Sequence, residues 1–156
     1  MRIEKSKRHS KLTGDFGETM LMYWLSKHGY DVAKVDFTGI DLIAYNRKTK
    51  ERLGITVRAR SRMEGTGKTS VSLPKRKKVF DACKSFACSP YLAIVVDSVD
   101  EGNKIRLYLL AWSEIKKLHI KGGEKNWYMK KRYLEKYEKN PKIKKITFNY
   151  EIKDWS

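Results

Sequence analysis

The chain has 156 residues, which suits one domain with a buried core, and hydrophobic residues make up 40% of it. That hydrophobic share excludes an intrinsically disordered chain. Lys and Arg number 35 against 18 Asp and Glu, and the formal net charge of +17 favours a polyanionic partner, nucleic acid before membrane.

Nothing in the sequence is typical of a membrane or secreted protein. No apolar run follows the first basic residues, so we expect no signal peptide, and no segment approaches the ~20 apolar residues of a membrane span. The two cysteines, Cys83 and Cys88, suit a reducing compartment and lack the neighbouring His or Cys of a metal site. We therefore expect a cytoplasmic protein that does not contact a membrane.

The chain begins with a basic segment and a long helix. Residues 1–12 carry five Lys or Arg and one acid, which predicts a tail that is either frayed or in contact with phosphates. Residues 13–28 have the apolar period of a helix, capped by Thr13 and ended by a glycine. Glu18 lies in its first turns. It either interacts favourably with the positive end of the helix dipole or belongs to a functional site, since the neighbouring glycines allow other backbone to approach closely.

Two strands joined by a polar turn form the centre of the sequence. Residues 40–45 and 53–59 are apolar and β-branched, and residues 46–51 between them are polar turn material. An acid, Asp41, stands at the start of the first strand. Because strand side chains alternate faces, one face of the second strand is basic. That face carries Thr56, Arg58, Arg60 and Arg62.

A basic stretch follows this pair of strands. Residues 63–70 form a Gly-, Ser- and Thr-rich loop that lacks the glycine spacing of a Walker motif, so we interpret it as a flexible loop that grips a nucleic-acid backbone. A helix is predicted over residues 73–86. Its first turn holds four cations, which the helix dipole disfavours unless an anion lies nearby. Between Arg47 and Lys84 there are 13 basic and 3 acidic residues.

The remaining elements follow from short apolar runs separated by polar turns. We expect strands at residues 30–36, 91–97, 104–111, 126–130 and 143–152, and helices at residues 112–119 and 131–139. The run at residues 91–97 is continuously apolar, which is typical of a strand that is buried on both faces. The sequence contains no internal repeat and no long linker. It therefore predicts a single domain over residues 13–156 that ends in a small αβ extension.

The order of these features resembles the PD-(D/E)XK nuclease superfamily, which includes restriction endonucleases and archaeal Holliday-junction resolvases. The resemblance covers about residues 13–111. GDFGE at residues 14–18 is similar to the helical glutamate motif of that family, and GIDLI at residues 39–43 is similar to its aspartate strand. ITVR at residues 55–58 falls where the family has an apolar residue, Glu or Gln, an apolar residue and Lys. The resemblance implies an α/β fold with a restriction endonuclease-like core, in which helices flank a mixed central sheet.

The resemblance also implies a site, and the sequence departs from it at two positions. In active members the acids hold Mg²⁺, which would place the metal on Asp41 and Glu18. Thr56 replaces the second acid with a weaker ligand, and Arg58 replaces the lysine with a group that cannot act as a general base. Arginine can still clamp a phosphate. We interpret these four residues as the altered catalytic group of a DNA-binding protein whose phosphodiesterase activity is weakened or lost.

Three alternatives stay open from the sequence. The first is an active Mg²⁺-dependent endonuclease with a variant site, in which Glu51 or Glu64 could substitute for the missing acid. The second is an α/β domain in which Asp41 makes only a structural salt bridge. The third is a basic protein associated with RNA or the ribosome, which the charge permits although no RNP-like aromatic motif is present.

The sequence also predicts an ion pair within the site. We expect Arg58 to reach toward the carboxylate of Asp41 and to neutralise it. Resemblance to resolvases and restriction enzymes favours a homodimer, because two-fold symmetry suits two DNA strands. The candidate phosphate contacts are Arg60, Arg62, Lys68, Lys75, Arg76 and Lys77.

Overall fold

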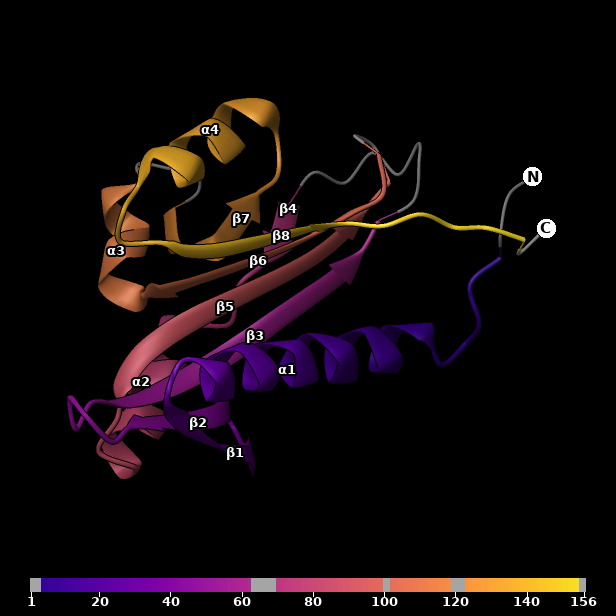
Figure 1. Cartoon of the computed structure of the whole chain (residues 1–156). Helices are drawn as coiled ribbons and strands as arrows, with labels where there is room; N and C mark the ends of the chain where they lie inside the picture. The colour runs from indigo at the N-terminus through magenta and orange to yellow at the C-terminus, as the bar shows by residue number, and fades with distance from the viewer. Residues whose placement is uncertain (1–3, 63–69, 100–101, 119–122, 155–156) are drawn as a thin grey trace.

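A six-stranded mixed sheet forms the centre of the molecule (Figure 1). The structure, a computed structural model, describes residues 4–62, 70–99, 102–118 and 123–154. In the order in which they lie in the sheet, the strands are β1 (Tyr30–Phe37), β2 (Ile40–Asn46), β3 (Arg52–Ser61), β5 (Ser89–Ser98), β6 (Lys104–Ala111) and β8 (Lys144–Asn149). Only β3 and β5 run parallel, and the other neighbours in the sheet are antiparallel.

Helices cover both faces of this sheet. One face carries α1 (His9–Lys27), seen in indigo in Figure 1. The opposite face carries α2 (Arg76–Ser85), α3 (Trp112–Lys117), α4 (Lys131–Lys139) and a two-stranded sheet of β4 (Ser70–Ser72) and β7 (Asn126–Tyr128). A short 3-10 turn, η1 (Gly123–Lys125), precedes β7. Two apolar cores result, one on each face.

Strand β5 separates the two cores. Val95 packs with Leu21 of α1 on one face of the sheet. The preceding residue, Ile94, points to the opposite face and packs with Val79 of α2. All of these side chains are at most 1% exposed. The continuous apolar run at residues 91–97 therefore does form a strand buried on both faces, as the sequence predicts.

Helix α1 approaches the sheet closely at one glycine. A Cβ atom at Gly17 would lie 2.8 Å from the Cβ of Ala59 on β3, whereas a Cβ at Gly14 would meet nothing within 4 Å. The helix begins at His9, four residues before the predicted start, and Thr13 does not cap it. The Thr13 hydroxyl instead donates to the His9 carbonyl at 2.8 Å. Residues 9–12, which the sequence assigns to the tail, are therefore helical.

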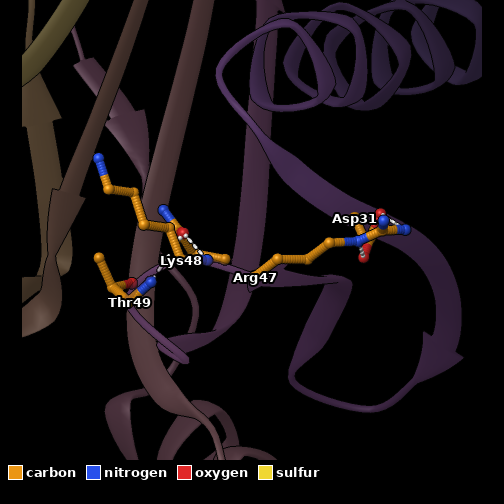
Figure 2. Close-up of polar contacts among 5 residues, drawn as sticks. Asp31, Arg47, Lys48 and Thr49 are labelled. Atoms are coloured by element: carbon orange, nitrogen blue, oxygen red, sulfur yellow. Dashed lines mark hydrogen bonds and ion pairs between the residues drawn. The ribbon is translucent and has the colours of Figure 1, made fainter.

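The turn between β2 and β3 is built by side-chain hydrogen bonds (Figure 2). The Asn46 side-chain oxygen accepts from the amides of Lys48 at 2.9 Å and Thr49 at 3.1 Å, an arrangement that suits Asn in turns. Arg47 donates both arms of its guanidinium to Asp31 on β1, and this hydrogen-bonded pair lowers the pKa of Asp31. The polar turn that the sequence predicts at residues 46–51 is thus confirmed.

The remaining predicted elements differ mainly at their ends. Strand β6 and helix α4 have the predicted bounds, whereas α2, α3, β7 and β8 are shorter than predicted. Helix α2 starts after Lys75, whose backbone is extended at ψ 126°. Strand β4, at the end of the predicted Gly-, Ser- and Thr-rich loop, was not predicted from the sequence. Residues 63–69 of that loop lie outside the described part of the chain. None of the described helices is long and apolar enough to cross a membrane.

Candidate nucleic-acid interface

The side chain of Asp41, near the start of β2, is hydrogen-bonded to the backbone in the middle of β3. The backbone pairing of the two strands runs from Tyr45 and Arg52 to Leu42 and Ile55. Beyond it, Asp41 Oδ2 accepts a hydrogen bond from the Val57 amide at 2.6 Å. A carboxylate thus replaces a strand carbonyl as the partner of a backbone N–H, and the charge shortens the hydrogen bond.

Thr56 lies beside Asp41, whereas Arg58 does not form the predicted ion pair with Asp41 in the described structure. The hydroxyl of Thr56 is 3.5 Å from Asp41 Oδ2, and Thr56 is only 3% exposed. Arg58 is exposed, and no ion pair joins it to Asp41 among the described residues. The expectation that Arg58 neutralises Asp41 is therefore wrong. The physical reason is that the Val57 amide already stabilises the carboxylate.

Glu18 is engaged by a lysine of the edge strand β1. Lys34 Nζ lies 2.7 Å from Glu18 Oε2 and 3.7 Å from Asp15 Oδ1. The hydrogen bond to Glu18 is the main reason that the pKa of Lys34 is raised. The carboxylate that the family resemblance would assign to a metal is thus balanced by an ammonium group.

The residues at this place do not fit the Mg²⁺ site that the resemblance implies. The ligand that remains beside Asp41 is the hydroxyl of Thr56, and within the described ranges no group of three or more His, Cys, Asp or Glu could hold a metal ion. Glu51 cannot replace the missing acid, because it lies five positions before Thr56, roughly 16 Å along the extended chain. The Glu51 carboxylate instead accepts from the Tyr91 hydroxyl at 3.1 Å. Glu64 lies outside the described residues.

A basic groove lies where β3 extends beyond β2. Strand β3 stays paired with β5 as far as Ser61, but its described pairing with β2 ends at Ile55. A cavity of about 550 Å³ opens beside the end of β3, between the start of α1 and residues 71–73, and its described lining residues include no acid. We call this cavity the cationic groove. Its cationic side chains are Lys5, Lys7, Arg58 and Arg60.

The chain before α1 closes one side of the cationic groove. Lys5 Nζ donates to the Ser61 carbonyl at 2.6 Å and lies 3.3 Å from the Ser61 hydroxyl oxygen. Lys7 lines the same cavity. Sequence reasoning did not place either lysine in the site, although the basic character of residues 1–12 was the signal that could have indicated them.

The other predicted phosphate contacts are placed differently. Arg60 lines the cationic groove with Arg58. Arg62 follows β3, and its amide donates to the Asp97 carbonyl at 2.7 Å. Lys75 is exposed immediately before α2. Lys68 lies outside the described residues.

Two of the predicted contacts in α2 already have partners. The guanidinium of Arg76 lies 4.0 Å from the centre of the Phe80 ring, and its Nε is 3.8 Å from Glu124 Oε1. Lys77 pairs with Asp81 one turn further along the helix. Two of the four consecutive cations at residues 75–78 thus have partners within the fold.

The sequence matches no protein-family model and no curated protein. Among solved structures, the chain is similar to a Holliday junction resolvase from the archaeal hyperthermophile Archaeoglobus fulgidus. The similarity has a TM-score of 0.51 at 15% sequence identity, and it covers 74% of this chain and 88% of the resolvase. At this identity the likeness shows the fold alone, and it confirms the predicted mixed α/β architecture with a restriction endonuclease-like core.

Proposed function

We propose that the chain is a DNA-binding protein on a nuclease fold that has lost metal-dependent phosphodiester cleavage. The observation that carries the proposal is the cationic groove, in which two arginines and two lysines share a cavity with no described acid. The fold of the similar protein, which is named a Holliday junction resolvase, supports the choice of DNA.

Binding would rest on the geometry of the two arginines. Each guanidinium offers a planar fork that suits two oxygens of one phosphate, while Lys5 and Lys7 add positive point charges to the lining of the groove. Arg58 and Arg60 are both exposed, so neither has to leave a buried partner to meet a phosphate. Neutralised phosphates release their counterions, so affinity should depend strongly on salt and little on sequence.

Loss of cleavage follows from the partners of the acids. Asp41 accepts from the Val57 amide, Glu18 is paired with Lys34, and Thr56 supplies a neutral oxygen where a carboxylate would be needed. Arg58 remains protonated and cannot take a proton from water. Among the described residues, the chain therefore keeps the cations that attract phosphate and lacks the second acid and the lysine that cleavage would need.

Incubation with supercoiled plasmid and linear duplex tests this proposal, in buffers that contain Mg²⁺, Mn²⁺ or a chelator. We expect retarded mobility in every buffer and no nicked or shortened product. Metal-dependent nicking by the wild-type chain would favour the alternative of an active endonuclease with a variant site. Preferential competition by structured RNA over duplex DNA would favour the RNA-binding alternative instead.

We further propose that the protein acts in the cytoplasm as a homodimer, since two-fold symmetry suits the two strands of a duplex. Sedimentation with and without DNA measures the oligomeric state. A monomer in both conditions would contradict the dimer and leave the binding proposal intact.

A further inference from the structure

A second cavity adjoins the cationic groove. Its volume is about 360 Å³, within the range of small-molecule sites, and we call it the apolar pocket. The two cavities share lining residues at the start of α1 and the end of β3, so the charged cavity and the apolar one lie next to each other. The shared residues are His9, Thr13, Ala59, Arg60 and Ser61.

The walls of the apolar pocket come from α1 and from the face of the sheet that α1 covers. Phe16 and Leu12 of α1 form one wall, and they are 44% and 52% exposed. Val95 and Ile105, from the neighbouring strands β5 and β6, also line it, and Tyr150 lies in the segment after β8. An aromatic ring that stays nearly half exposed beside a basic groove is available to stack on a ligand.

One polar pair lies at the edge of this pocket. The Tyr150 hydroxyl donates to Asp97 Oδ1 at 2.7 Å, which fixes the tyrosine ring against the pocket. Burial, helped by this hydrogen bond, raises the pKa of Tyr150 to about 12, so the hydroxyl remains a donor at neutral pH. Asp97 also lines the pocket and is its one described acid, which offers an acceptor for an amino group.

We propose that the apolar pocket receives the base of an unpaired nucleotide whose phosphate is bound in the cationic groove. The proposal rests on the DNA-binding function proposed above and adds a preference for DNA with an unpaired base. Arg60 lines both cavities, so a phosphate that Arg60 binds would lie beside the apolar pocket. A nucleotide has the matching chemistry, because its sugar joins a charged phosphate to a flat aromatic base.

A fully paired duplex cannot use the apolar pocket without losing a base pair. Bringing a base out of a duplex costs unstacking and unpairing energy, which is smallest where the base is already unpaired. Stacking of a base on an aromatic side chain tolerates any base, because every base has a π face. We therefore expect an unpaired nucleotide to raise affinity about tenfold, at the lower end of what base stacking contributes.

Fluorescence anisotropy with three labelled probes tests the proposal on the full chain. The probes are a perfect duplex, the same duplex with one extra unpaired thymidine, and the same duplex with an extra abasic nucleotide. We expect the thymidine probe to bind about tenfold more tightly than the other two. Phe16→Ala should abolish this ratio. Tyr23→Ala is the matched control, because Tyr23 is an aromatic residue of the same helix, 58% exposed and outside the pocket.

The outcomes separate this inference from the function on which it rests. Equal affinity of all three probes for the wild-type chain would overturn the base pocket while DNA binding stands, and this comparison requires no variant. A preference that survives Phe16→Ala would also overturn it. Failure to bind any probe would contradict the proposed function itself.

Discussion

Substituting Gly17 with alanine should weaken the fold at the junction of α1 and β3. The new Cβ would lie 2.8 Å from the Ala59 Cβ and 3.5 Å from the Val95 Cβ. Real Cβ atoms do not approach so closely, and the Ala59 Cβ is bonded directly to the β3 backbone, so the helix or the strand must move. Overpacking of this kind typically costs about 1–3 kcal/mol.

A neighbouring glycine provides the control for this substitution. Gly14 lies in the same helix, and a Cβ there would meet nothing within 4 Å. Gly14→Ala should therefore stabilise the protein by about 1 kcal/mol through helix propensity alone. Gly17→Ala has the same favourable helix propensity, but the steric overlap with Ala59 opposes it. The two variants should differ by about 2 kcal/mol, or roughly 4–8 °C in Tm for a chain of this size.

Thermal and denaturant unfolding of both variants measures this difference. Adding Ala59→Gly removes the atom that the new methyl group meets, so Gly17→Ala should be harmless in that background. Such a double-mutant cycle isolates the contact between the two positions. If Gly17→Ala stabilises the protein as much as Gly14→Ala does, the close approach of α1 and β3 is refuted.

The remaining predictions concern charge. Arg60→Ala should weaken binding to all duplex sequences alike and lower the slope of log affinity against log salt by about one, measured by titration at several salt concentrations; an unchanged slope would exclude a phosphate contact. Arg58→Ala should change the free energy of unfolding by less than about 0.5 kcal/mol, since the side chain is exposed, and a loss of several kcal/mol in melts would restore the ion pair with Asp41. The double variant Thr56→Glu/Arg58→Lys should gain Mg²⁺ binding by calorimetry, and no gain would mean that more than these two positions separates the site from those of the active nucleases that the sequence resembles. Arg47→Ala should raise the pKa of Asp31 toward its ordinary value, as measured by NMR titration. Because Arg47 lowers that pKa, the pair stabilises the fold at pH values above the unfolded-state pKa of Asp31, and this stabilisation is lost as the pH falls through the folded-state pKa. A destabilisation of equal size at low and neutral pH would contradict this linkage.

The sequence predicted the fold best where local signals agreed with the tertiary structure. Helix α4 and strand β6 have the predicted bounds. Asn140 and Pro141 mark the end of α4, and polar residues before Lys104 mark the start of β6, which passes directly into α3 at Trp112. Strand β4 could not be found in this way. Its three residues, Ser-Val-Ser, have no clear period, and they form a strand because they pair with β7, which lies more than 50 residues further along the chain.

The candidate site was predicted in part. Side-chain alternation in β3 predicts that Arg58 and Arg60 lie on one face of the strand, and both line the cationic groove. It could not show that the Val57 amide would bind the Asp41 carboxylate, since this depends on where the β2 ladder ends. Nor could it bring Lys5 into the groove, because only the contact with Ser61 fixes the path of the first residues.

Affinity for duplex DNA in a chelating buffer tests the central claim most directly. The wild-type chain should bind without any metal, and the double variant Arg58→Ala/Arg60→Ala should lose about 100-fold, since each charged hydrogen bond contributes about 1.5 kcal/mol or more. The control Lys27→Ala/Lys153→Ala removes the same charge outside the groove and should lose far less. Equal losses in the two double variants, or binding that requires Mg²⁺, would contradict the account.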